Sequence, residues 1–461
     1  MVGQRAGVWR IADPRGETLA VVLMLPILLA IAIWNRFPII YYDTGAYLVQ
    51  GIGGAFLEER SPVYSLFLAV AGGAWSLWLV VIAQAAITAF VMVETARAMA
   101  PRLTVPVFLV IGAGLVILTG MAWYVGQVEP DCFTAIVALA FYLLIFHGPS
   151  LTRGRRIALF LIASFAIAAH PSHLVLSAGL IASALIYKSA ASRGSKQWPA
   201  ARVLMPTLSL ALGIVLIVAA NFGFTRQIFI SRAGPVFIFS RLVQDGIVMR
   251  LLEDTCPQSG YRLCAYKDEL PRTADQWLWD ADTPFKKMQG FEGTNAESQR
   301  IIFDSLRRYP MMHLRTALAD TWRQFELFHT GDQVEPQEWV LYPVFMRIIP
   351  AQAPAYMSAR QQKGEFDFSG WNWLHIRAGW IAIVGLAALI LFAAITTRRR
   401  EAVFLTFIML ALWGNAAVCG ALSNPHDRYQ SRIVWLAPFA LALMAVQGRR
   451  FALREPVESG T

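Results

Sequence analysis

Charge is scarce in this chain. Only 15% of its 461 residues are Asp, Glu, Lys or Arg, whereas 56% are hydrophobic, and the mean hydropathy is +0.49. A soluble domain needs a wet surface and carries about 25% charged residues. Because this composition cannot cover a soluble fold, it predicts an all-α polytopic membrane protein.

The signatures of nucleotide handling are also missing. The sequence has no G-x-x-x-x-G-K-[ST] motif and no strand followed by G-x-G-x-x-G, so nothing indicates an ATP-driven pump. A net charge of +10 could point to nucleic acid. The basic residues, however, form short clusters between apolar runs and not a stripe interleaved with aromatics. We therefore expect no nucleic-acid partner.

The abundant feature is long apolar segments, and about ten of them could cross roughly 30 Å of hydrocarbon. Some are shorter than twenty residues and could instead be re-entrant or buried. The segments span residues 18–34, 75–96, 103–121, 132–146, 157–169, 174–187, 203–220, 376–395, 402–421 and 433–447.

Basic residues fall in alternate short connections between these segments, which the positive-inside rule assigns to the cytoplasm. They are Arg5, Arg10, Arg15, Arg97, Arg102, Arg153, Arg155, Arg156, Lys188, Arg193, Lys196, Arg202, Arg398, Arg399, Arg400, Arg449, Arg450 and Arg454. We therefore expect a multi-pass protein of the bacterial inner membrane with both termini in the cytoplasm.

This topology predicts three parts. Residues 1–220 form a transmembrane module with an outer juxtamembrane loop at 35–74, and residues 376–461 form the last helices and a short cytoplasmic tail. Residues 221–375 form an outer, mainly helical region with amphipathic runs. Cys256 and Cys264, two of only four cysteines, lie in this region. Since an outer compartment is oxidising, we expect a disulfide between them.

Ionisable residues gather near membrane level on the predicted outer side. Such groups are functional candidates by default, although any one of them could snorkel into the headgroups. They are Asp43, Glu58, Glu59, Arg60, Glu129, Asp131, His170, His173, His426, Asp427, Arg428 and Arg432.

No cofactor is expected from the remaining motifs. Asp280-Ala281-Asp282 resembles a metal-chelating acidic pair of nucleotide-sugar transferases, but no strand and helix alternation surrounds it, so a solvated turn is favoured. His170 and His173 could ligate a metal from one helical face. Pro171 between them instead favours a break between two helices. A divalent metal therefore has no support.

Four motifs together resemble the GT-C integral membrane glycosyltransferases, which include protein O-mannosyltransferases and lipid A aminoarabinose transferases. The resemblance covers roughly the first 220 and, more loosely, the last 85 residues, and it leaves the 221–375 region unmatched. The motifs are "YYDTGAYL" at 41–48, "RSPVYSLFL" at 60–68, "GQVEPDCF" at 126–133 and "HDRYQSRIVWLAP" at 426–438.

The resemblance implies that a sugar moves from a polyprenyl phosphate carrier to a lipid, glycan or protein acceptor on the outer side. By this likeness Asp43 is the base, with Glu129 or Asp131 as further catalytic carboxylates. Many relatives carry two adjacent acids where this chain has Asp43-Thr44, so Glu58, Glu129 or Asp131 must supply a second one. Cations would bind the phosphate. The substrate-binding candidates are Arg60, Tyr64, His170, His173, His426, Arg428, Tyr429 and Arg432.

Other interpretations stay open. Asp43 could cap a juxtamembrane helix, Asp131 could complement a helix dipole, and each Arg could pair with Glu58, Glu59 or Asp427.

A lipid or solute transporter would also need polar groups at membrane level, but its site should lie near the midplane in two related halves. A non-catalytic component of a polysaccharide assembly or export complex would use 221–375 for docking. The sequence sets no oligomeric state.

Overall fold

The computed structural model describes residues 9–192, 198–396 and 398–448, and within these ranges it is helical, with two isolated β-bridges and no strand. The two ends of the chain lie outside the described residues, and so do Arg5, Arg193, Lys196, Arg449, Arg450 and Arg454. The predicted all-helical class is confirmed.

The first part of the chain forms eleven α-helices and three short 3-10 or π turns. They are α1 (Pro14–Leu28), α2 (Ala30–Asn35), α3 (Tyr42–Gly51), α4 (Pro62–Val70), α5 (Leu77–Met99), α6 (Val105–Leu118), α7 (Met121–Val125), η1 (Pro130–Cys132), α8 (Phe133–Tyr142), η2 (Leu143–His147), η3 (Gly148–Ser150), α9 (Arg153–Ala169), α10 (Pro171–Ser192) and α11 (Leu204–Thr225).

The remaining described helices belong to residues 221–375 and to the last apolar segments. They are α12 (Gly234–Gln244), α13 (Ile247–Thr255), η4 (Arg262–Glu269), α14 (Ala274–Trp279), α15 (Pro284–Lys287), α16 (Gly290–Arg308), α17 (Pro310–Glu326), α18 (Glu338–Ile348), η5 (Pro350–Gln352), α19 (Ala353–Ser358), α20 (Ser369–Ile395), α21 (Arg399–Leu422), α22 (Asp427–Val434) and α23 (Leu436–Gly448).

Seven described segments are long and apolar enough to cross a membrane, which supports a multi-pass membrane protein. Their outward faces carry exposed apolar side chains, as a lipid-facing surface requires; in α20, for example, Ile381 and Val384 are exposed. The seven are Leu77–Met99, Pro130–Ser150, Pro171–Ala191, Leu204–Thr225, Ser369–Ile395, Arg399–Leu422 and Asp427–Gln447.

The expected count of about ten is not confirmed, because three predicted segments form shorter helices. Segment 18–34 is interrupted at Leu29, which separates α1 from α2. Segment 103–121 yields α6, with 14 residues. Segment 157–169 lies in α9, which has 17 residues and ends before His170. His170 is extended because it precedes Pro171, and a residue before proline is pushed out of helical geometry.

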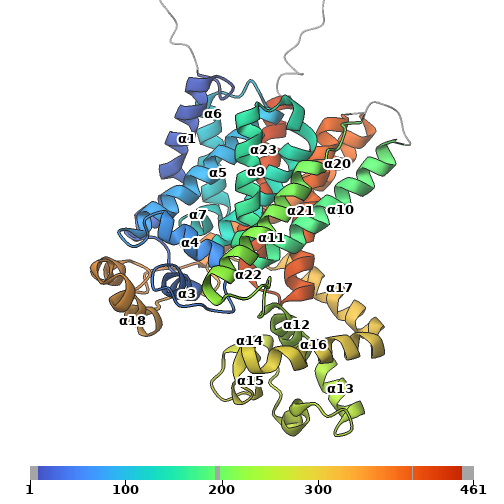
Figure 1. Cartoon of the computed structure of the whole chain (residues 1–461). Coiled ribbons are helices and arrows are strands. Elements are labelled where there is room, and N and C mark those ends of the chain that lie inside the picture. The colour runs from blue at the N-terminus through green and yellow to red at the C-terminus, as the bar shows by residue number, and fades with distance from the viewer. Residues whose placement is uncertain (1–8, 193–197, 397, 449–461) are drawn as a thin grey trace, which may run out of the picture.

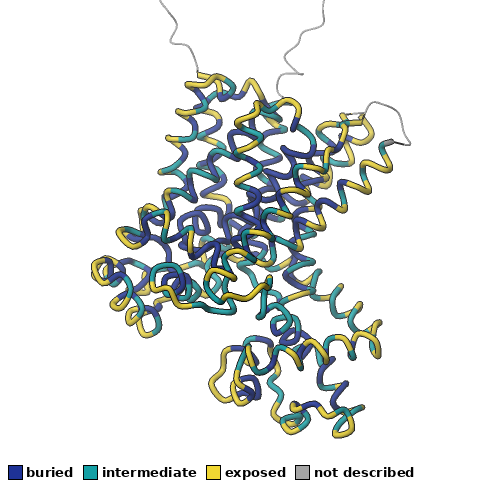
Figure 2. Tube along the Cα trace, in the orientation of Figure 1, coloured by how far each residue is buried: buried dark blue, intermediate teal, exposed yellow. Residues whose placement is uncertain are grey.

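The helices pack as a bundle with a lobe beneath it (Figure 1). Buried residues concentrate in the centre of the bundle, and exposed ones line its rim and the lobe (Figure 2). The lobe has its own hydrophobic core, built from residues between Val236 and Ile301 and including Phe239, Trp277 and Phe285. It therefore holds its shape by burying apolar surface independently of the membrane.

The region predicted as one outer piece contributes to two cores. After the lobe, α17 returns to the bundle, and Phe325 stacks on Trp413 of α21 with ring centroids 3.9 Å apart. Gly420 permits this approach, since a Cβ there would lie 2.4 Å from the backbone oxygen of Asp320. Helices α18 and α19 then pack their buried faces into the main core. Residues 325–359 therefore belong structurally to the bundle.

Cys256 and Cys264 are joined in a disulfide, with Cα atoms 5.7 Å apart. The bond closes the loop that follows α13 on the surface of the lobe core. The other two cysteines, Cys132 and Cys419, are buried and free.

The topology can be tested with two single cysteines. Asp280 is exposed in the lobe, and Gly154 is exposed at the start of α9, where an added side chain meets nothing within 4 Å. In intact cells, we expect an impermeant maleimide to label Asp280→Cys and not Gly154→Cys. Native cysteines give little background because they are buried or bonded. Equal labelling of both positions would contradict the predicted orientation.

Candidate functional site

Asp43 lies in the first turn of α3, at the end of the bundle that faces the lobe (Figure 1). The start of this helix is satisfied by Thr44, whose Oγ1 accepts a hydrogen bond from the backbone N–H of Tyr41 at 3.0 Å. Thr44, and not Asp43, therefore supplies the capping interaction. This leaves the Asp43 carboxylate available for partners elsewhere in the fold.

Two guanidinium groups flank Asp43. Arg60 donates a hydrogen bond to Oδ1 of Asp43, and Nη2 of Arg428 lies 3.6 Å from Oδ2. The side chains are 14% exposed for Asp43 and Arg60 and 16% for Arg428. Although burial lowers the pKa of Arg60, the charge of Asp43 raises it overall, which keeps the guanidinium protonated. Positions 43, 60 and 428 thus form one partly accessible charged centre.

Aromatic rings hold the two arginines in place. The Arg428 guanidinium carbon lies 4.5 Å from the ring centre of Tyr41 and 5.0 Å from that of Tyr429. Arg60 lies 6.0 Å from the ring of Trp279, which comes from α14 in the lobe. These are cation–π distances, and such contacts fix the orientation of a guanidinium without consuming its N–H donors. The lobe therefore reaches the charged centre.

Glu129 lies next to this centre but is buried. Its Oε1 is 3.3 Å from Oγ1 of Thr44. Burial raises the pKa of Glu129 well above its ordinary value, and the nearby negative charges of Asp43 and Asp131 raise it further. This favours the neutral acid over the carboxylate. Of the three predicted catalytic carboxyl groups, Asp43 is therefore the one that both pairs with two arginines and is partly accessible.

Asp131 and Arg432 form a buried ion pair. Nη1 of Arg432 donates to Oδ1 of Asp131 at 2.6 Å, and the two side chains are 4% and 0% exposed, for Asp131 and Arg432 respectively. Nη2 of Arg432 lies 3.3 Å from Ser172 Oγ and 3.4 Å from Asn415 Oδ1. The expected phosphate-binding role of Arg432 is not supported by this geometry, because protein groups surround its guanidinium. The predicted catalytic role of Asp131 is likewise not supported, because its carboxylate is buried in the ion pair with Arg432.

His170 and His173 lie side by side with ring centres 5.2 Å apart. Both nitrogens of His173 have protein partners, Thr134 Oγ1 and the carbonyl of Ala166, each at 2.7 Å. In His170 only Nδ1 has partners among the described residues, both from Ser172: its Oγ at 2.7 Å and its backbone N–H, which donates at 3.2 Å. Burial lowers the pKa of His170 and so favours its neutral form. His173 therefore has a packing role, whereas Nε2 of His170 remains available for a ligand.

Tyr64 also has a packing role. Its ring is fully buried, and its hydroxyl donates to Gln84 Oε1 at 2.6 Å. Gln84 in turn donates to the carbonyls of Val125 and Gln127. Through this chain of bonds, Tyr64 connects α4 to the segment that carries Glu129. Its predicted contact with substrate has no support in this arrangement.

His426 lies between two carboxylates that sequence reasoning missed. Its Nε2 is 3.2 Å from Asp275 of α14, and its Nδ1 is 3.7 Å from Asp332. Burial lowers the pKa of His426, but these two carboxylates outweigh it and raise the pKa to about 10. Asp332 also accepts a hydrogen bond from the backbone N–H of Arg428. No local sequence pattern indicated this cluster, because Asp275 and Asp332 lie within residues 221–375, far from His426 in sequence.

No group of three or more His, Cys, Asp and Glu side chains is arranged to hold a metal ion within the ranges that the structure describes. The centre is instead rich in alternating charges, with carboxylates and guanidiniums from α3, the 35–74 loop, the segment before α8 and α22. Such an arrangement suits an anionic ligand that can replace a carboxylate between two arginines.

No protein-family model matches the sequence, and neither does any curated protein or solved structure. The likeness to GT-C enzymes therefore rests on the four sequence motifs alone.

The Asp131–Arg432 pair allows a double-mutant test. Removing one partner of a buried ion pair leaves the other charge uncompensated, which typically costs about 3–5 kcal/mol. We expect Asp131→Asn to lower the unfolding temperature in detergent strongly, and Asp131→Asn/Arg432→Gln to recover part of that loss. Strictly additive losses would show that the two side chains do not depend on each other.

The His426 cluster predicts a pH-dependent stability. Because the folded pKa is raised from about 6.5 to about 10, the contribution is fully present below about pH 6.5 and is lost as the pH rises through 10. We expect His426→Gln to lower the unfolding temperature most near pH 6 and least near pH 10. His313→Gln is the control, because burial lowers the pKa of His313. A His426→Gln deficit that does not shrink with pH would refute the ion cluster.

Proposed function

We propose that this protein is a glycosyltransferase that takes a sugar from a polyprenyl phosphate carrier on the outer side of the membrane. The observation that carries the proposal is Asp43 held between Arg60 and Arg428, which come from three separate stretches of the chain. The centre is partly exposed and lies near the outer end of an apolar helical bundle. A lipid-linked phosphate needs both features, cations for its headgroup and apolar surface for its chain.

Without substrate, Asp43 satisfies the two guanidiniums. An entering phosphate offers them more oxygen acceptors and more charge than one carboxylate does. The arginines would turn to the phosphate, and the Asp43 carboxylate would lose its partners at the place where the acceptor hydroxyl arrives. In this proposal, donor binding itself frees the base.

The reaction then needs one proton transfer and one displacement. Asp43 takes the proton of the acceptor hydroxyl as that oxygen attacks the anomeric carbon of the sugar. The bond from this carbon to the phosphate oxygen breaks, and the polyprenyl phosphate leaves with the bonding electron pair. Arg60 and Arg428 stabilise the negative charge that grows on the phosphate. Tyr41, Tyr429 and Trp279 keep these arginines oriented.

The test is Asp43→Asn in purified protein supplied with a radiolabelled polyprenyl-phosphate sugar. The amide keeps the size of the side chain but cannot accept the proton, so release of polyprenyl phosphate should fall by about 10²–10⁴. Glu59→Gln is the matched control, since Glu59 is a carboxylate of the same loop with no ion pair among the described residues. We expect it to retain activity.

Stability separates a catalytic role from a structural one. Asp43→Asn should unfold at close to the wild-type temperature and still bind the donor. A well-folded Asp43→Asn with normal glycosyl transfer would remove Asp43 as the base. Absence of any polyprenyl phosphate release from the wild type, with a panel of lipid-linked sugars, would contradict the proposed function and favour an accessory role in envelope assembly.

A further inference from the structure

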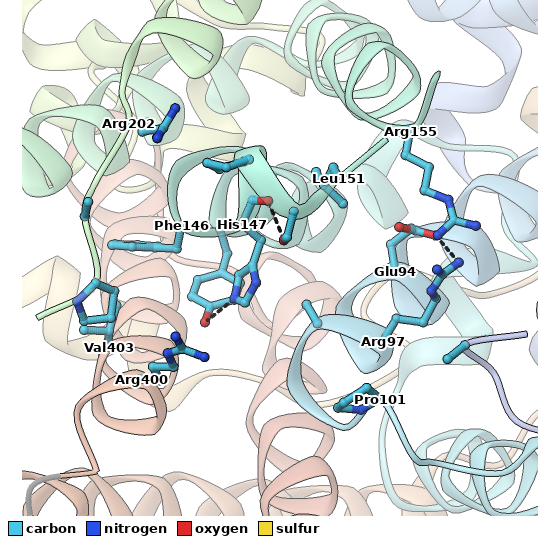
Figure 3. Close-up of a pocket in the computed structure, with 17 residues that line it drawn as sticks. Glu94, Arg97, Pro101, Phe146, His147, Leu151, Arg155, Arg202, Arg400 and Val403 are labelled. Carbon is cyan, nitrogen blue, oxygen red and sulfur yellow. Dashed lines mark hydrogen bonds and ion pairs between the residues drawn. The ribbon is translucent and has the colours of Figure 1, made fainter. Parts of the chain in front are cut away.

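A second site candidate lies at the other end of the bundle. A cavity of about 580 Å³ is lined by four arginines, Arg97, Arg155, Arg202 and Arg400, and by His147 (Figure 3). Along the segment that contains α8, His147 lies sixteen positions after Asp131, or about 24 Å at 1.5 Å per residue. The cavity is thus separate from the glycosyltransferase centre and does not depend on that assignment.

The charges around this cavity do not balance. Arg97 and Arg155 both pair with Glu17, and each lies within 3.6 Å of Glu94, which gives two cations against two carboxylates. Arg202 and Arg400 lie on the opposite side of the cavity in Figure 3. Neither has an ion pair with any residue that the structure describes. Two positive charges therefore line the cavity without an ion-pair partner among the described residues.

Apart from Ser150, the rest of the wall is apolar or aromatic. Phe146, Leu151 and Val403 line the cavity, and the Tyr142 hydroxyl lies 3.3 Å from Nε2 of His147. From Phe146, a row of rings continues to Tyr187 at 5.5 Å and on to Trp198 at 6.4 Å. Tyr and Trp are typical of the membrane–water boundary, where one side of the ring is apolar and the other is wet. A ligand here meets cations and apolar surface together.

We propose that this cavity binds a phosphate group, carried by an anionic membrane lipid or by a soluble phosphate ester. Basic pockets between membrane helices recognise phosphate-bearing headgroups in this way, and planar guanidiniums bind phosphate oxygens in a bidentate manner. Arg202 and Arg400 supply the two cations. The neutral quartet of Glu17, Glu94, Arg97 and Arg155 fixes the opposite wall.

The experiment measures affinity for two probes, dioleoyl phosphatidylglycerol in mixed micelles and glycerol 3-phosphate in solution. We expect the Arg202→Gln/Arg400→Gln variant of the full-length protein to bind these probes at least about tenfold more weakly than the wild type does. Arg202→Lys/Arg400→Lys keeps the charges and should retain part of the affinity. Arg102→Gln/Arg153→Gln is the control, since both residues are exposed arginines outside the cavity wall.

Tighter binding of phosphatidylglycerol would assign the site to a lipid, and tighter binding of glycerol 3-phosphate would assign it to a soluble ester; both support a phosphate site. Wild-type affinity for both probes in the Arg202→Gln/Arg400→Gln variant overturns the proposal. An equal loss in the control pair also overturns it, because that result means general attraction to a basic surface. Unfolding temperatures of all variants are measured in parallel, and glycosyl transfer is not needed as a readout.

Discussion

The buried ion pair between Asp131 and Arg432 is the interaction on which the end of the bundle that faces the lobe depends. It joins the turn before α8 to α22, residues that lie 301 positions apart. A charge buried without its partner is costly, so neither group can move alone. Helix α22 begins directly after His426 and carries Arg432. Arg428 and Tyr429 lie on the same helix, one helical turn before Arg432. Fixing Arg432 therefore fixes the residues that face Asp43.

A second constraint comes from the segment that follows α17. Thr330 Oγ1 lies 2.8 Å from Nδ1 of His375 in α20, and Asp332 contacts His426 and the backbone of Arg428. The absence of a side chain at Gly120 lets Thr330 and Ser431 lie close to the backbone there, since a Cβ at this position would lie 2.8 Å from the hydroxyl oxygens of both residues. The lobe therefore reaches the charged centre through Asp275 and Trp279 of α14, and the segment after α17 supports the same centre through Asp332.

The two ends of the bundle differ in how their arginines are paired with carboxylates. At the end that faces the lobe, Arg60 and Arg428 pair with Asp43, and Arg432 pairs with Asp131, so each of these arginines has a carboxylate partner without a ligand and the centre can exchange one anion for another. At the other end, Glu17 and Glu94 balance only Arg97 and Arg155, and Arg202 and Arg400 remain. Since cations facing a partly apolar cavity favour an anion, both ends present arginines that an anion can approach.

Composition and hydropathy alone determined the all-helical membrane class, since burying so many apolar residues needs lipid and since backbone groups in lipid must be paired within helices. The motifs placed Asp43, Arg60, Glu129 and Arg428 near one another, because ionisable groups at helix ends on one side share one aqueous face. Only the tertiary structure separated their roles. Burial and partner choice made Asp131 and Arg432 a structural pair, occupied both nitrogens of His173, and brought Asp275 and Asp332 to His426. Such contacts join residues distant in sequence, and no local pattern encodes them.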